Sequence, residues 1–243
     1  VDLSQAFLDE FDIALPPGTI GGSGKGELAV EFQEGVPPAF SLSSDLIGMR
    51  VAIPAVGWSK APQTTGRLLV EGTLGEVPTV DQLEVSGGGL NARGRINLGS
   101  DGQLQSAAFS QVRIGDWLNA PITLRGRGSG QPVGVEISGG ALDLRAARFG
   151  GGEGESGPVS INLDSLQITE GVALTDFTGE FRSEGGFRGQ FDGSVNGAAR
   201  IAGTVVPRNG RSAVGLRSDD AGGVLRASGV METAVGGSLD LTL

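Results

Sequence analysis

Apolar and polar residues alternate along most of this chain, and glycines separate the alternating segments. Residues 90–98 read Leu-Asn-Ala-Arg-Gly-Arg-Ile-Asn-Leu, with apolar side chains at every second position apart from Gly94. Successive side chains of a β-strand point to opposite faces, so a period of two predicts strands with one apolar and one polar face. The same pattern fills most of the chain after residue 27. It predicts an all-β fold based on a long, curled, largely antiparallel sheet.

A helical spacing occurs only near the N-terminus. Phe7, Leu8 and Phe11 follow Ser4, a residue type that caps helix N-termini. The spacing predicts one short helix over 4–11, and a total helix content below about 10%, compared with the usual third.

Turn residues predict how some strands are joined. Asp101-Gly102 lies between two alternating runs and predicts a hairpin that connects 89–98 to 104–114. Near the C-terminus, the short apolar segments 224–227, 232–235 and 238–243 are interpreted as strands.

The stretch 150–157, Gly-Gly-Gly-Glu-Gly-Glu-Ser-Gly, is the segment richest in glycine and predicts a flexible loop or a boundary. The alternation resumes beyond it, so we expect residues 1–243 to form one continuous β-groove segment. Because an alternating run extends to Leu243, we expect this segment to belong to a longer protein.

Residues suited to catalysis are scarce. The chain has no His, Cys or Tyr, which excludes the usual nucleophilic triads, thiol chemistry and disulfides. Neither lysine, Lys25 or Lys60, has a surrounding motif for a Ser–Lys dyad. The pair Asp219-Asp220 is typical of an Asx turn or a strand-end cap, and the aromatic platforms of a glycosidase are missing. We therefore predict no enzyme, no catalytic or metal-binding residues and no cofactor.

The net charge of −10, from 28 acidic and 18 basic residues, is unfavourable for nucleic acid as a partner. The basic residues are almost all arginines scattered along the sequence, and we interpret them as a solvated outer face. No run of 18 apolar residues occurs, so no transmembrane helix is predicted.

The apolar residues at every second position of the predicted strands are the only extended set of candidate binding residues. Two interpretations of them remain open. They form either the closed core of a sandwich or β-helix that binds partners by its surface, or an open groove that takes up acyl chains. Aromatic residues make up only 5% and Gly numbers 44, which suits a single curved sheet better than a sandwich core. The residues predicted to line the groove are Leu90, Ile96, Leu98, Ile122, Leu124, Val133, Val135, Ile137, Leu142, Leu144, Ile161, Leu163, Phe187, Phe191, Ile201 and Val205.

Several short segments resemble the AsmA-like family of Gram-negative envelope proteins, most closely its YhdP-type branch. They are Gly57-Trp58-Ser59-Lys60, 140–145 (Gly-Ala-Leu-Asp-Leu-Arg), 193–197 (Gly-Ser-Val-Asn-Gly) and 218–226 (Ser-Asp-Asp-Ala-Gly-Gly-Val-Leu-Arg). The resemblance implies a long periplasmic β-groove, similar to lipid-transfer bridges, anchored to the inner membrane by a part of the protein not present here. It implies phospholipid as the ligand, the inner and outer membranes as partners and no catalytic residues. We therefore expect a segment of a periplasmic lipid-transfer conduit.

Overall fold

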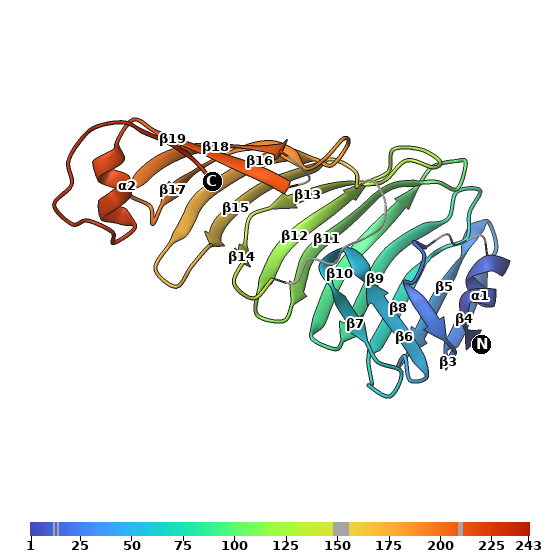
Figure 1. Cartoon of the computed structure of the whole chain (residues 1–243). Coiled ribbons are helices and arrows are strands. Elements are labelled where there is room, and N and C mark those ends of the chain that lie inside the picture. Colours follow the sequence, from blue (N-terminus) through green and yellow to red (C-terminus); the bar gives the residue numbers. More distant parts are fainter. Residues whose placement is uncertain (12, 14, 148–155, 209–210) are drawn as a thin grey trace. The chain divides into compact units, whose positions relative to one another are not determined.

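The computed structural model describes residues 1–11, 13, 15–147, 156–208 and 211–243 (Figure 1). Strands make up 57% of the structure and helices 7%, which confirms the all-β prediction and the low helix content. The predicted loop at 150–157 lies outside the described residues except for Ser156 and Gly157. The chain forms two compact units, Val1–Gly115 (unit 1) and, among the described residues, 116–147 with 156–243 (unit 2).

Unit 1 is based on an antiparallel sheet in which each strand pairs with its neighbour. Gly102 adopts φ +74° and its N–H donates to the carbonyl of Gly99 over 2.9 Å, so the predicted hairpin at Asp101-Gly102 is confirmed. The strands, in sheet order, are β4 (Glu27–Gln33), β5 (Val36–Ser44), β8 (Arg67–Thr73), β9 (Thr79–Gly87), β10 (Leu90–Leu98) and β11 (Leu104–Ile114).

Smaller elements pack on one end of this sheet. The Ser4 side chain accepts a hydrogen bond from the Phe7 N–H (3.3 Å) and caps α1, as predicted. Leu3, Leu46 and Met49 form a buried cluster against Leu42 and Leu68 of the sheet. The helical elements are α1 (Gln5–Glu10) and the 3-10 turn η1 (Pro54–Val56). A two-stranded sheet contains β1 (Asp2–Leu3) and β3 (Gly24–Lys25), and a three-stranded sheet contains β2 (Ile20–Gly22), β6 (Met49–Ile53) and β7 (Trp58–Lys60).

A buried lysine holds this layer together. Lys60 is 1% exposed, and its ammonium donates to the carbonyls of Leu46 (2.7 Å), Met49 (3.1 Å) and Ala61 (3.1 Å). Desolvation lowers the pKa of Lys60, against the opposing effect of the Asp45 carboxylate. Since Leu46 adopts φ +56°, which is uncommon for a residue other than glycine, the ammonium stabilises a constrained loop.

Unit 2 contains one layer of strands with a short helix at its end (Figure 1). The sheet is mainly antiparallel, but β15 runs parallel to both β13 and β14. The order is β12 (Leu118–Arg125), β13 (Gly134–Ser138), β15 (Val159–Gln167), β16 (Ala173–Arg182), β17 (Arg188–Val195), β18 (Ala199–Arg208), β19 (Arg211–Ser218) and β20 (Leu239–Thr242), while β14 (Ala141–Asp143) pairs with β12 and β15.

The C-terminal region differs in part from the sequence prediction. β20 confirms a strand within 238–243, but 232–235 contains no strand and 224–227 belongs to helix α2 (Ala221–Ala227). The Asp220 carboxylate accepts from the Gly223 N–H over 2.8 Å and caps the helix. A Cβ at Gly222 would lie 2.6 Å from the Val235 backbone, so this glycine permits close packing instead of acting only as a turn residue.

No helix in the described part of the chain has the length and apolar character needed to cross a membrane.

Candidate functional site

The strand pairing of unit 2 collects apolar side chains on one face of its sheet. Residues opposite each other in paired strands share a face, so the registers can be followed across the sheet as rows. The leucine row contains Leu118, Leu142, Leu166, Leu174, Val195 and Ala199. The isoleucine row contains Ile122, Ile137, Ile161, Gly179, Phe191, Gly203 and Leu216. The valine row contains Leu124, Val135, Val159, Phe181, Gly189, Val205 and Val214.

The opposite face is polar along the same strands. One of its rows contains Thr123, Glu136, Ser160, Glu180, Gln190 and Thr204. The Ser160 hydroxyl donates a hydrogen bond to the Glu180 carboxylate over 2.6 Å, so neighbouring polar side chains on this face form hydrogen bonds with each other. The sheet is therefore two-faced, as the alternation predicts.

A β-bulge keeps the apolar face continuous where the alternation breaks. Leu174 and Phe177 are three residues apart, a spacing that would place them on opposite faces of a regular strand. Asp176 adopts φ +50°, and the register with β17 shifts between Thr175 and Thr178. The extra residue, opposite Gly193, returns both apolar side chains to one face, and both are buried.

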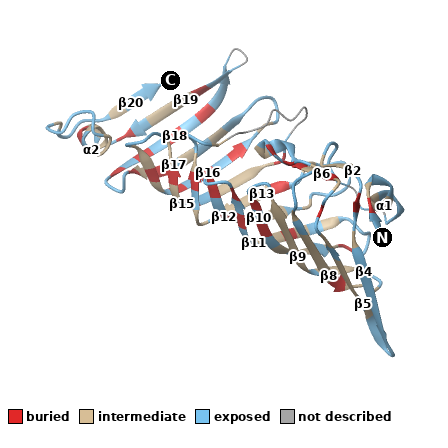
Figure 2. Ribbon diagram, turned by 90° about the horizontal axis from the view of Figure 1, so that it is seen from below, coloured by how far each residue is buried: buried red, intermediate tan, exposed pale blue. Residues whose placement is uncertain are grey.

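Exposure divides the apolar face into two parts (Figure 2). The leucine row is buried throughout, and the adjacent Leu163, Phe177 and Ile201 are 1%, 4% and 7% exposed. By contrast, the isoleucine and valine rows are only half-buried where they cross β12, β13 and β15. We call this half-buried part the accessible strip, and it consists of Ile122, Leu124, Val135, Ile137, Val159 and Ile161.

Phenylalanine rings lie over glycines in the remaining part of these rows. Phe191 is opposite both Gly179 and Gly203, and Phe181 is opposite Gly189. A Cβ at Gly203 would lie 2.1 Å from the Phe191 ring, so each ring occupies the space that a side chain on the facing strand would need. Glycine thus permits the rings to lie close to the sheet, and in unit 1 Phe40 is likewise opposite Gly72.

In the structure, the predicted groove residues fall into four groups by location. The predicted residues in unit 1, Leu90, Ile96 and Leu98, share one face of β10. Val133 and Leu144 lie outside the strands and are exposed. Phe187, also outside a strand and 48% exposed, stacks on Phe181 with ring centroids 5.4 Å apart. The apolar face of unit 2 brings together Ile122, Leu124, Val135, Ile137, Leu142, Ile161, Leu163, Phe191, Ile201 and Val205.

Sequence reasoning did not select several residues of this face. Phe177 and Phe181 flank Gly179 in strict alternation, so the signal was present in the sequence. Leu174 is out of phase with Phe177 on β16, and the bulge at Asp176 explains its position, while Leu166 of β15 lies opposite Leu174. Leu118, which was not among the predicted groove residues, begins β12 and is 3% exposed.

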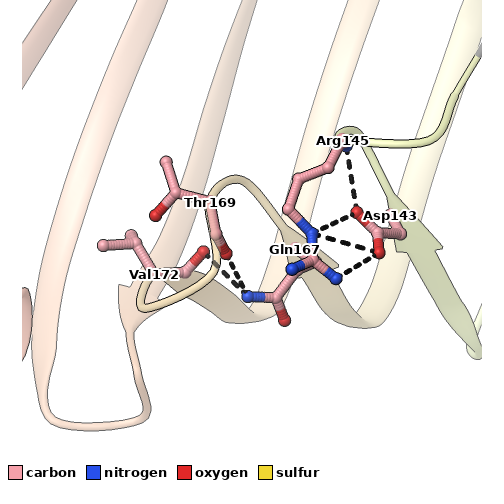
Figure 3. Close-up of polar contacts among 5 residues, drawn as sticks. All are labelled: Asp143, Arg145, Gln167, Thr169 and Val172. Atoms are coloured by element: carbon pink, nitrogen blue, oxygen red, sulfur yellow. Dashed lines mark hydrogen bonds and ion pairs between the residues drawn. The ribbon is translucent and has the colours of Figure 1, made fainter.

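Polar residues fix the end of the sheet next to the leucine row (Figure 3). Arg145 donates to both oxygens of the Asp143 carboxylate, and the shortest contact is 2.6 Å from the Arg145 guanidinium to Oδ2. These hydrogen bonds lower the pKa of Asp143. The Gln167 amide donates to the carbonyls of Thr169 (2.5 Å) and Val172 (3.3 Å), which closes the β15–β16 turn.

Asp143→Asn is expected to lower the free energy of unfolding modestly at pH 7 and not at all in strong acid. The folded carboxyl has the lower pKa, so its stabilising effect is complete above the unfolded value of about 3.9 and is lost as the pH falls through the folded value. Urea unfolding at several pH values tests this, with Asp192→Asn on the polar face as the control. A difference between wild type and Asp143→Asn that persists in acid would contradict this role.

The described residues offer little for catalysis or metal binding. Among them, no group of three or more Asp or Glu side chains is arranged to hold a metal ion. Lys60 uses its ammonium for three carbonyls, and Lys25 forms an ion pair with Asp2 over 2.5 Å. Both ammonium groups therefore have structural partners within the described part of the chain.

Comparisons with family models, curated proteins and solved structures gave no significant match.

Proposed function

We propose that the apolar face of unit 2 holds the acyl chains of phospholipids, and that the chain is a segment of a periplasmic conduit for lipid transfer between the inner and outer membranes. The accessible strip supports this proposal most directly. It is a band of branched aliphatic side chains across β12, β13 and β15, partly exposed on a sheet that forms a single layer among the described residues of unit 2. A contiguous apolar band that stays partly exposed is a surface on which an apolar ligand can bind.

The energetics of such a surface suit a passing ligand better than a permanently bound one. Each CH₂ group removed from water contributes about 0.8 kcal/mol, so an acyl chain of a dozen carbons gains on the order of 10 kcal/mol before the cost of ordering is subtracted. Three neighbouring strands would offer an acyl chain nearly equivalent contacts, through Ile122, Ile137 and Ile161. A chain can therefore move from one strand to the next without breaking a specific polar bond, as a conduit requires.

Placing a charge in the strip tests the proposal. Ile161→Asp is expected to weaken binding of a fluorescent diacylglycerol at least tenfold and to slow phospholipid transfer between vesicles, because a carboxylate in contact with an acyl chain loses its hydration. Asn162→Asp is the matched control, since it places the same side chain on the next residue of β15, on the exposed polar face. It should bind lipid as the unsubstituted chain does.

Circular dichroism of each variant establishes that the strands remain formed, and Ile161→Met should retain binding. Equal lipid binding by Ile161→Asp and Asn162→Asp would contradict the proposal. Absence of phospholipid from the gently purified protein in native mass spectrometry would favour the alternative of a closed structural protein.

A further inference from the structure

The first strand of the unit 1 sheet has an open side. β4 lies at the end of the strand order, pairs only with β5, and has all seven of its residues exposed (Figure 2). Val1 covers only the residue before this strand: its ammonium donates to the Gly26 carbonyl over 2.8 Å, and its carbonyl accepts from the Gly26 N–H over 3.0 Å. Within the described part of the chain, β4 is therefore an unpaired edge strand, the kind of strand that pairs with other chains.

The hydrogen bonds of β5 determine which backbone groups of β4 point outward. The Leu74 N–H donates to the Pro38 carbonyl over 2.8 Å, so the even-numbered residues of β5 bond to β8. Odd-numbered residues of β5 therefore bond to β4, and they lie opposite odd-numbered residues there. The even-numbered Leu28, Val30 and Phe32, which we call the outward triad, direct their N–H and C=O groups to the open side.

The outward triad also carries the apolar side chains of β4. Leu28 and Val30 are opposite Leu42 and Phe40 of β5, and each is 37% exposed. Phe32 is 81% exposed. Edge strands are usually protected by proline, lysine or inward-pointing charges, but β4 contains neither proline nor lysine, and its two glutamates alternate with the triad. Backbone groups and apolar side chains are thus available at the same three residues.

The outward triad is complementary to itself. In an antiparallel pair with β4 of a second copy, a two-fold axis at Val30 places Val30 opposite its own counterpart and Leu28 opposite Phe32. All three residues then form hydrogen-bonded pairs, with six backbone hydrogen bonds in total. An axis one residue to either side leaves only two such pairs, because Gly26 is already bonded to Val1 and Glu34 lies in the β4–β5 turn.

Charge favours the same register. With the axis at Val30, Glu27 lies opposite Gln33 and Glu31 opposite Ala29, so no two carboxylates are directly opposed. An axis at Ala29 would place Glu27 opposite Glu31, and an axis at Glu31 would place that residue opposite its own counterpart. Like charges directly opposite each other destabilise a strand pair. Hydrogen bonding and charge therefore select one arrangement independently.

A hollow lies where this register places Phe32 of the second copy. It has a volume of about 440 Å³ between α1 and β4, and its apolar lining comes from Phe7, Phe11 and Leu28. Phe32 is opposite Leu28 in the selected register, and residues opposite each other share a face of the sheet. The exposed ring of each copy is thus directed to the hollow of the other, and both rings would leave water.

We propose that this chain forms a symmetric dimer in which the β4 strands of two copies pair antiparallel about Val30. The occupant of the open edge is a second copy because the edge complements itself in hydrogen bonds, charge and shape. The two unit 1 sheets then become one sheet, and the row that contains Val30 and Phe40 continues across the axis. This inference concerns unit 1 and does not depend on lipid binding by unit 2.

Single cysteines test the dimer and its register on the whole chain, which has no cysteine of its own. Val30→Cys places two thiols in a hydrogen-bonded pair, where the Cα atoms are about 5.5 Å apart and a disulfide can form. Under mild oxidation, most of this variant should become a covalent dimer. Ala29→Cys and Glu31→Cys are the matched controls, because each is two residues out of register with its counterpart and beyond the limit of about 7 Å.

Sedimentation velocity measures how tightly the copies associate. Val30→Pro should weaken the dimer about thirtyfold, because it removes two of the six hydrogen bonds but no bond to β5. Phe32→Ser should weaken it about a hundredfold, because both rings lose their burial. Val30→Thr keeps the N–H group and the branched shape, so its effect should be about threefold or less. Circular dichroism establishes that each variant keeps its strands.

Three results would overturn the inference. An unsubstituted chain that stays monomeric at every attainable concentration would leave the edge to a strand of another polypeptide. Cross-linking through Ala29→Cys or Glu31→Cys as efficient as through Val30→Cys would contradict the register. A dimer that neither Val30→Pro nor Phe32→Ser weakens would have its interface on another surface.

Discussion

Lys60→Met is expected to lower the free energy of unfolding of unit 1 by about 3 kcal/mol. The substitution keeps the length and apolar body of the side chain but removes the charged donor of three hydrogen bonds at 2.7–3.1 Å. Hydrogen bonds from charged groups contribute about 1.5–3 kcal/mol each, and part of this is offset because burying the ammonium costs free energy. The left-handed backbone at Leu46 then loses the contact that stabilises it.

Lys25→Met is the control, because Lys25 is the only other lysine of the chain and its ion pair with Asp2 is exposed. It should leave unfolding unchanged within error. Urea unfolding followed by tryptophan fluorescence measures the effect, and a Trp117→Phe background leaves Trp58 of unit 1 as the only reporter. Equal stabilities of the two lysine variants would show that the Lys60 ammonium has no net stabilising role.

The alternation of apolar and polar residues was sufficient to predict the class of this fold. A period of two depends on backbone geometry alone, so the hairpin at Asp101-Gly102 and most strands could be predicted without knowledge of their partners. Helix α2 could not, because its first turn contains Gly222-Gly223, and glycine has poor helix propensity. The Asp220 cap is a local contact, but the close packing of Gly222 against Val235 is a tertiary contact that the local sequence does not reveal.

The candidate site was only partly predictable, for a related reason. Alternation identifies which residues of one strand share a face, and Ile122, Ile137 and Ile161 were selected in this way. It does not determine which side chains remain exposed once the sheet has formed, so Leu163 and Leu144 were grouped although one is 1% and the other 38% exposed. Exposure depends on the curvature of the sheet and on the neighbouring strands, which the pattern of a single strand does not contain.

Gly203→Ala is expected to lower the free energy of unfolding of unit 2 by about 2–3 kcal/mol. Gly203 is buried on β18, directly opposite Phe191, and a Cβ there would lie 2.1–2.5 Å from three carbons of the ring. The ring must leave its position over the strand, and it then loses the contact with Phe177 (5.6 Å between centroids). Overpacking of this kind typically costs about 1–3 kcal/mol, although alanine is otherwise the better strand residue.

Two further variants separate the ring contact from a general intolerance to alanine. Gly171→Ala is the control, because a Cβ there has no atom within 4 Å and Gly171 has no positive φ; its stability should equal that of the wild type. Phe191→Ala removes the ring, so adding Gly203→Ala to it should cost nothing more. The double-mutant cycle should therefore give an interaction energy of about 2 kcal/mol, measured by urea unfolding with Trp117 as the reporter in a Trp58→Phe background. Additive losses would contradict the pairing of ring and glycine, and the close approach of the rings to the sheet would then need another explanation.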